Sequence, residues 1–318
     1  MNPSTPTRHQ TQDTRHASAA RDVPSRAALA QQLLVTRQLS DLLPALEQRN
    51  IRSVLLKGTA FWTCLYEPGE RPVSDIDLLV HPRDFEQAKA ALIDLGYERY
   101  EAENRPATTR AYYNHGFRPA RGQPGTVVEL HRCLTHPIRY DIDMDGLVDR
   151  AEPCVAGRTR AWRLSPEDAL LHLAIHRSMH FGGFDEDPRN HEDAHRIVSQ
   201  RHIDWDSLAA RAGAWGCATV LWILLDSIAR RHGTPVPADV LGRIQPSRVR
   251  IKYLGRALHR FNGAWTLRRQ DLPGWQRRFA VFPLQLDRPG QFARSAWFYG
   301  TTRLRDLLEP LRGNGTSA

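Results

Sequence analysis

An apolar stretch that carries two aspartates at alternate positions places the strongest constraint on how this chain folds. Residues 73–80 read Val-Ser-Asp-Ile-Asp-Leu-Leu-Val, a pattern typical of a β-strand. Because side chains alternate along a strand, Asp75 and Asp77 share one side, with Cα atoms roughly 6.6 Å apart. Unpaired ionised groups are costly to bury, so the pattern predicts either an edge that faces water or a bound cation.

The segments around this strand predict an α/β arrangement. Leucines spaced three, four and seven residues apart predict an amphipathic helix over residues 26–49. We expect a short strand over 51–56 that ends at a Lys57-Gly58 turn, and then a short helix over 59–66. A helix that begins at Pro82 follows the aspartate strand. Further strands are expected over three segments, 97–100, 111–117 and 126–131.

The second half of the chain has the pattern of a helical domain. Ser165 and the acids after Pro166 are typical of a helix start. Helices are expected over 166–181, 190–200, 205–215, 217–232, 237–244 and 249–261. The fold class is therefore α+β, with an α/β domain over 27–160, a helical domain over 161–312, a disordered tail over 1–26 and a short tail over 313–318.

Composition excludes several protein classes. Hydrophobic residues make up 41% and charged residues 25%, as in ordinary globular proteins. The chain has no apolar run of membrane-spanning length and no signal-peptide core, which predicts a cytoplasmic protein without a membrane partner. The four cysteines form no C-x-x-C pair, so a zinc knuckle or a disulfide framework is not expected.

Positive charge is concentrated near the C-terminus. The net charge is +9, and residues 247–312 contain 14 arginines and lysines but only four acids. This region can dock an anionic partner, or it can be a solvated arginine-rich surface; a nucleic-acid partner is not favoured. The aromatic residues there fit buried helix anchors better than base stacking, and they include Trp265, Trp275, Trp297, Phe298 and Tyr299.

An acid in a second apolar strand suggests a shared metal site. Glu129 lies in Val127-Val128-Glu129-Leu130-His131. Magnesium prefers hard oxygen ligands and keeps waters and phosphates in its shell, so carboxylates on a sheet suit a nucleotide-bound metal. In phosphoryl transfer, two such ions lie about 3.5 to 4 Å apart.

These residues and their order resemble the uncharacterised nucleotidyltransferases of the DNA polymerase β superfamily. The resemblance extends from Leu33 to Val240 and continues in the helical half through Leu170-Leu171-His172-Leu173, His176, Asp193 and Trp205. The motifs that carry it in the first half are Leu56-Lys57-Gly58-Thr59-Ala60, Arg71-Pro72, Ser74-Asp75-Ile76-Asp77-Leu78-Leu79-Val80, Gly96-Tyr97 and Val128-Glu129-Leu130-His131.

The resemblance implies a mixed sheet with flanking helices and a metal-dependent transfer of a nucleoside monophosphate from an NTP, ATP among the candidates, to a hydroxyl or phosphate. Two Mg²⁺ ions, or Mn²⁺ instead, would bind Asp75, Asp77 and Glu129. Gly58 and Thr59 match the turn that receives the triphosphate, although Thr59 is larger than the usual residue. Some members of the group accompany peptide-modifying gene clusters, so such partners are candidates, whereas neither the acceptor nor the base is identified.

Other residues are assigned around this core. Lys57 and Arg71 flank the phosphate turn and can neutralise charge on pyrophosphate; Arg71 can equally hold a carboxylate. Ser74 is included on the nucleotide side, although strict alternation points it away from the aspartates. His131 and His176 are placed on the acceptor side.

Two alternatives remain open at this point. The first is a catalytically inactive protein of the same fold that binds an acidic or nucleic-acid partner. The second is a metallohydrolase built on a group of histidines and acids, for which no H-E-x-x-H motif is present. The residues that suggest it are His172, His176, His180, His191, Glu192, Asp193 and His195.

Overall fold

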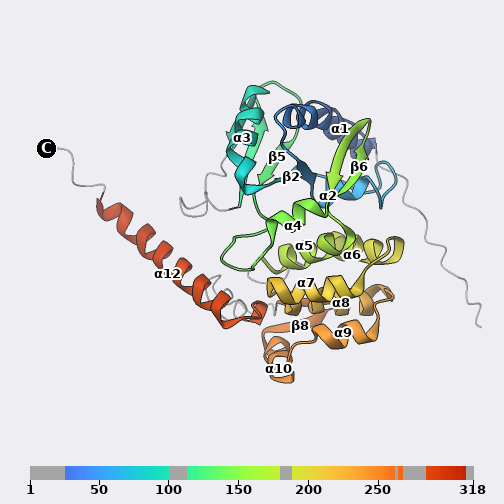
Figure 1. The fold of residues 1–318 in the computed structure, drawn as a ribbon, viewed down its shortest axis with the longest axis vertical. Coiled ribbons are helices and arrows are strands. Elements are labelled where there is room, and N and C mark those ends of the chain that lie inside the picture. The colour runs from blue at the N-terminus through green and yellow to red at the C-terminus, as the bar shows by residue number, and fades with distance from the viewer. Residues whose placement is uncertain (1–25, 101–112, 180–187, 262–263, 268–283, 313–318) are drawn as a thin grey trace, which may run out of the picture.

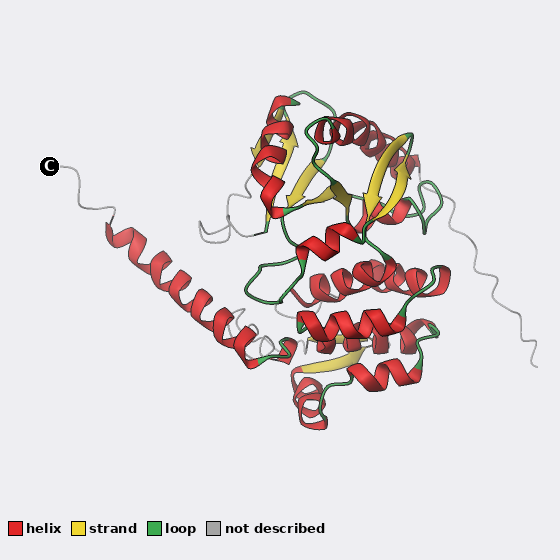
Figure 2. Cartoon of the chain, viewed as in Figure 1, coloured by secondary structure: helices red, strands yellow, loops and turns green. Residues whose placement is uncertain are grey.

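The computed structural model describes residues 26–100, 113–179, 188–261, 264–267 and 284–312, and shows a sheet-containing part beside a helical part. In Figures 1 and 2, the sheet lies at the top with α1 (Arg26–Glu47) and α3 (Phe85–Asp94), and the helices from α5 (Pro166–Met179) to α10 (Arg248–Ala257) lie below it. The expected tails, 1–26 and 313–318, fall outside the described residues except for Arg26.

The strands form one mixed sheet in the order β3-β4-β5-β2-β1-β7-β6. The β2 strand is parallel to β5 and antiparallel to β1, and β1 is parallel to β7. Two strands at one edge, β6 and β7, were not expected from the sequence. The bounds are β1 Ser53–Leu55, β2 Asp75–Val80, β3 Tyr97–Tyr100, β4 Asn114–Pro119, β5 Val127–His131, β6 Glu152–Ala156 and β7 Thr159–Arg163.

Helices of the first half cover the sheet or connect its strands. Helix α1 (Arg26–Glu47) packs against β1, β7 and α3 (Phe85–Asp94), and buries Leu39, Leu42 and Leu46. Its leucine spacing predicted this face, although Leu33 nearer the start is 64% exposed. A short 3₁₀ helix, η1 (Pro82–Asp84), leads into α3. The remaining helices of this half are α2 (Lys57–Trp62) and α4 (Met144–Asp149).

The second half is built around α8, whose middle is buried on all sides. Helices α5 and α6 pack against α8 and against each other, and α7 and α9 complete the bundle. The long helix α12 points away from the body in Figure 1. The bounds are α5 Pro166–Met179, α6 Pro188–Gln200, α7 Trp205–Trp215, α8 Ala218–His232, α9 Ala238–Ile244, α10 Arg248–Ala257 and α12 Pro289–Arg312.

The structure corrects three expectations about these elements. Helix α2 begins at Lys57 and ends at Trp62, so Lys57 and Gly58 belong to the helix rather than to a turn before it. The expected helix over 249–261 ends at Ala257, and a hairpin of β8 (Leu258–Phe261) and β9 (Ala264–Leu267) follows. Trp297 is 76% exposed on α12, so it is not a buried anchor.

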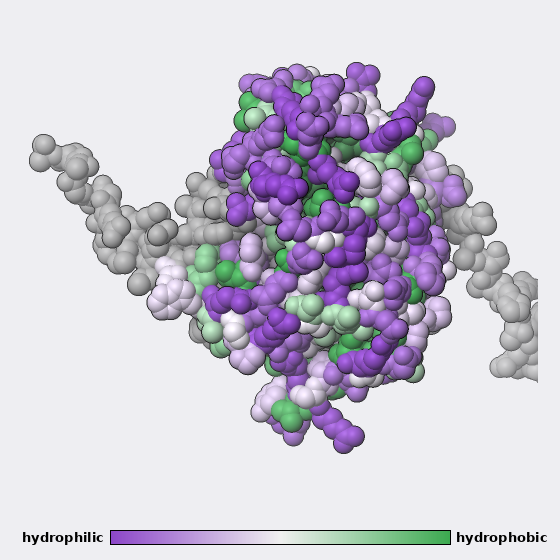
Figure 3. Space-filling view, in the orientation of Figure 1, coloured by the Kyte–Doolittle hydropathy of each residue, from purple (hydrophilic) through white to green (hydrophobic). Residues whose placement is uncertain are grey.

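The surface is largely polar. Hydrophilic residues predominate on the face shown in Figure 3, where hydrophobic residues form small separate patches. Part of the charge of the basic C-terminal region is balanced, since Arg250 pairs with Asp287, and Arg288 and Arg294 pair with Asp141. None of the described helices combines the length and the apolar character needed to cross a bilayer.

Candidate active site

Parallel pairing of β2 and β5 brings the three predicted carboxylates to one face of the sheet. Asp77 lies opposite Glu129, and Asp75 lies opposite Val127. Residues opposite each other in neighbouring strands point to the same side, so Asp75, Asp77 and Glu129 share that side. The sequence predicted the Asp75 and Asp77 alternation, and the strand pairing adds the position of Glu129.

Asp77 is the most buried of these acids and contacts a lysine and a histidine. Its Oδ1 atom lies 2.7 Å from Nζ of Lys57 and 2.9 Å from Nε2 of His131. Nε2 of His131 is also 3.5 Å from Oε2 of Glu129, and the Asn114 amide donates to the same oxygen at 2.9 Å. His131 therefore bridges the carboxylates of Asp77 and Glu129. From the sequence, this histidine was expected on the acceptor side, and the structure places it among the acids.

These contacts set the charge of each group. Burial tends to raise the pKa of Asp77, but Lys57 and His131 hold it well below its usual range. Burial tends to lower the pKa of Lys57, yet Asp77, Glu129 and Asp75 together raise it. The Asp75 carboxyl has a raised pKa because it is buried and lies near Asp77. The site therefore holds ionised Asp77 beside a charged Lys57.

The donor set fits a divalent cation. Asp77, Glu129 and His131 each offer a ligand atom, these atoms lie within 4.8 Å of one another, and no second such group occurs in the described part of the chain. Asp75 adds a hard carboxylate oxygen on the same face. Buried acids are costly unless a cation is paired with them. The chemistry of these donors, mainly carboxylate oxygen with one imidazole, suits Mg²⁺ or Mn²⁺.

Lys57 and Gly58 form the start of α2 beside these acids. Lys57 has a left-handed backbone conformation, with a φ of +47°. This conformation costs a non-glycine residue roughly 1 kcal/mol or more. The ion pair of Lys57 with Asp77 offsets that cost. A Cβ atom on Gly58 would lie 2.4 Å from Nη1 of Arg71 and 2.8 Å from Cγ2 of Val73. Only glycine fits this close approach.

Thr59 and Ser74 have partners that the sequence did not predict, whereas Arg71 holds a carboxylate, one of the two roles left open for it. Thr59 is buried, and its hydroxyl donates to the carbonyl oxygen of Leu56 at 3.1 Å. The guanidinium of Arg71 binds the carboxylate of Asp193 on α6. Ser74 precedes the first paired residue of β2, so strand alternation does not govern it, and its hydroxyl donates to Asp75 at 3.0 Å.

Helix α5 brings a histidine to the same side. His172 is buried, and burial together with the charges of Lys57 and His131 lowers its pKa to about 3. His176 lies one turn further along, with ring centroids 5.9 Å apart. The sequence singled out His176 for the acceptor side but not His172, which interacts electrostatically with Asp77. The sequence signal for His172 was its spacing of four residues from His176, which places both on one face of the helix.

The histidine-based metallohydrolase finds no support in the described residues. His172, His176, His191 and His195 do not gather with acids into a metal-ligating group there, and His180 lies outside those residues. Instead, His195 contacts the Thr234 hydroxyl at 2.8 Å, and Asp193 binds Arg71.

A pocket adjoins the site on the α2 side. It lies among α2, the end of β7, α5 and α6, and its walls are mainly apolar. The polar residues that line it are Lys57, Arg163, His172 and Arg201.

One family of proteins matches most of the chain. A family model described as uncharacterised nucleotidyltransferase matches residues 22–233. No curated protein sequence matches the chain.

Solved structures of nucleotidyltransferases are similar to this chain at low identity. The lincosamide antibiotic adenylyltransferase LnuA, bound to lincomycin, is 16% identical with a TM-score of 0.34, covering 51% of this chain and 96% of that protein. The nucleotidyltransferase toxin MenT4 from Mycobacterium tuberculosis is 15% identical with a TM-score of 0.40, covering 88% and 94%. At TM-scores this low, the likenesses do not bear on the activity of this chain.

Proposed function

Because the chain belongs to the family of uncharacterised nucleotidyltransferases, we propose that it transfers a nucleoside monophosphate from an NTP to a hydroxyl or phosphate acceptor and releases pyrophosphate. The observation that carries this proposal is the register of β2 and β5, which sets Asp77 opposite Glu129 on the face that carries Asp75. Lys57 supplies a positive charge beside them.

Asp75, Asp77 and Glu129 would hold the divalent cations, for which we propose Mg²⁺, with Mn²⁺ as the alternative. When bound, such ions neutralise phosphate charge and stabilise the attacking and leaving oxygens. In the transfer, an acceptor oxygen forms a bond to the α-phosphorus while the bond from that phosphorus to the bridging oxygen breaks. A hydroxyl acceptor loses its proton in this step.

The residues around the acids have separate roles in this proposal. Lys57 and Arg71 stabilise negative charge on the leaving pyrophosphate, and Gly58 lets the Arg71 guanidinium lie close to the start of α2. Despite burial, the hydrogen bond from His131 lowers the pKa of Glu129. A lowered pKa makes a weaker base, so Glu129 serves better as a metal ligand than as a proton acceptor.

Labelled nucleotides test this function. The purified protein is incubated with each common α-labelled NTP, with Mg²⁺ or Mn²⁺, and with fractions of a cell extract as the source of acceptor. We expect label transfer that chelation of the metal abolishes, and a loss on the order of 100-fold or more in Asp77→Asn and Asp75→Asn. Glu98→Gln is the matched control, since Glu98 is an exposed acid of the same sheet that pairs with Arg118.

The outcomes separate the enzyme from its alternative. Transfer that persists in Asp77→Asn would contradict the assigned site. NTP binding without transfer to any fraction would instead favour a binding protein of the same fold.

A further inference from the structure

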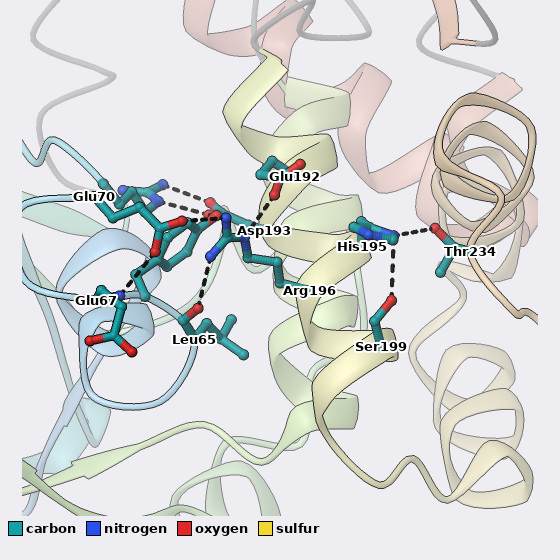
Figure 4. A network of polar contacts seen from close by, with 11 residues as sticks. Leu65, Glu67, Glu70, Glu192, Asp193, His195, Arg196, Ser199 and Thr234 are labelled. Carbon is teal, nitrogen blue, oxygen red and sulfur yellow. Dashed lines mark hydrogen bonds and ion pairs between the residues drawn. The ribbon is translucent and has the colours of Figure 1, made fainter. Parts of the chain in front are cut away.

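The loop between α2 and β2 is tied to helix α6 by two arginine pairs. Figure 4 shows this network, in which residues of the loop face α6. Arg196 on α6 reaches back to Glu70 at 2.5 Å and to the carbonyl oxygen of Leu65 at 3.1 Å. Arg71 on the loop reaches forward to Asp193, so the two pairs run in opposite directions between the same two elements.

Arg71 uses only one side of its guanidinium for this pair. Nε lies 2.7 Å from Oδ1 of Asp193, and Nη2 lies 2.6 Å from Oδ2. A guanidinium offers five donors in a rigid fork, so the second edge, formed by Nη1 and Nη2, stays available for another anion. Among the described residues, Nη1 has a single contact of 3.4 Å to the Pro72 carbonyl oxygen, which is long for a hydrogen bond.

The available edge of Arg71 lies over the start of α2. Nη1 is 2.4 Å from the position that a Cβ of Gly58 would occupy, so it lies directly beside the Gly58 backbone. The ring of Phe61 lies 5.8 Å from the guanidinium on the same helix. Arg189, one turn before Asp193, adds a positive charge that acts on Arg71.

Asp193 is itself held rigidly. Its side chain is fully buried, and the Tyr66 hydroxyl donates to its Oδ1 at 2.6 Å. A buried carboxylate with two fixed partners has little freedom, so it determines the orientation of the arginine that it binds.

We propose that Asp193 is a positioning residue for nucleotide binding, because it orients Arg71 so that the second edge of the guanidinium contacts the triphosphate at Gly58. This inference rests on the proposed function and extends it to the helical half of the chain. The ligand chemistry is that of a polyphosphate chain, which a planar two-donor edge recognises through adjacent oxygens. The base of the nucleotide plays no part in this contact.

A purely structural role for Asp193 makes a different prediction. If the pair only joined α6 to the loop, breaking it would resemble breaking the pair between Arg196 and Glu70, which joins the same elements without involving Arg71. Glu70→Gln is therefore the matched control for Asp193→Asn.

Titration calorimetry with inorganic tripolyphosphate and Mg²⁺ tests the proposal without knowledge of the base. We expect the wild-type protein to bind, Asp193→Asn and Arg71→Gln each to bind about 10-fold more weakly, and Glu70→Gln to bind as the wild type does. In an Arg71→Gln background, Asp193→Asn should cause no further loss, because Asp193 acts through Arg71. Melting temperatures of all variants report the effect on folding.

Each result has a distinct meaning. Equal affinity in Asp193→Asn and the wild type overturns this inference alone, as does an equal loss in Glu70→Gln. If the wild type binds neither tripolyphosphate nor any NTP, the proposed function fails together with it. Should Asp193→Asn not fold, Tyr66→Phe removes one of the two partners of Asp193 and should weaken tripolyphosphate binding by a smaller factor; unchanged affinity there also overturns the inference.

Discussion

His172 shows how a single buried side chain beside the candidate site makes the stability of the fold depend on pH. Its Nε2 atom has no hydrogen-bond partner among the described residues, and it lies in the positive field of Lys57 and His131. Burial and these charges lower its pKa to about 3. The imidazole is therefore neutral at physiological pH, which keeps a further positive charge away from Lys57.

This residue predicts a loss of stability in mild acid. The unfolded chain takes up a proton at His172 near its ordinary pKa of about 6.5, whereas the folded chain does so near 3. Because the unfolded state binds more protons in that interval, the free energy of unfolding falls as pH drops, by about 2 kcal/mol from this group between pH 7.5 and pH 5.

Urea denaturation at the two pH values measures this contribution. We expect the difference between pH 7.5 and pH 5 to shrink by about 2 kcal/mol in His172→Phe. His202, an exposed histidine, provides the control variant His202→Gln, which should leave the difference unchanged. An unaltered pH dependence in His172→Phe would show that the histidine is charged in the folded protein.

At the scale of single elements, α2 begins where glycine is needed for space. Replacing an exposed glycine in a helix by alanine stabilises a protein by about 0.5–1 kcal/mol. Gly58 should show the opposite sign, because its added methyl group would meet Arg71 and Val73, and Arg71 is held by Asp193.

A pair of alanine variants tests this sign. Gly58→Ala should lower the free energy of unfolding by about 1–3 kcal/mol. Gly242→Ala on α9, where no atom lies within 4 Å of the added methyl group, should raise it by about 0.5–1 kcal/mol. Chemical denaturation of both variants gives the two values. Stabilisation by Gly58→Ala would mean that the space between Gly58 and Arg71 is wider than the structure shows.

The elements also show what the sequence could predict. The apolar alternation of β2 and the helix start at Ser165 depend on neighbouring residues, so the strand and helix α5 were predicted within a few residues. The β6 strand was missed because it is short and contains Pro153, and β7 because arginines interrupt its apolar residues. The β7 strand is stabilised by parallel pairing with β1 about a hundred residues earlier.

The same distinction applies to the candidate site. Asp75, Asp77 and Glu129 follow local strand patterns and were predicted together. The bond between Arg71 and Asp193 and the contact between Asn114 and Glu129 depend on tertiary packing, for which the sequence carries no local signal. Strict alternation pointed Ser74 away from the aspartates, whereas its hydroxyl donates to Asp75, because β2 begins one residue after Ser74.

At the scale of the whole molecule, buried ion pairs hold the sheet and the helices together. Asp168 at the start of α5 is fully buried and binds Arg150, which follows α4, and Arg211 of α7. Asp141 has a comparable pair of arginine partners, Arg288 and Arg294, but all three side chains are at least 36% exposed.

Burial predicts different costs for breaking these two networks. Asp168→Asn removes the buried counter-charge shared by two partly buried arginines and should lower the free energy of unfolding by about 2–4 kcal/mol. Asp141→Asn should lower it by less than about 1 kcal/mol, because exposed ion pairs are screened by water. Thermal unfolding of the two variants makes the comparison, and equal losses would contradict the difference in burial.

The separation of Arg71 from Asp193 has a consequence for protein synthesis. The two residues are 122 positions apart, and every strand of the large sheet precedes Asp193 in the chain. On the ribosome, the sheet and its carboxylates are therefore complete while Arg71 still lacks the carboxylate that orients it. Under the proposed role of Asp193, a nascent chain gains its full affinity for triphosphate only after α6 has emerged and folded.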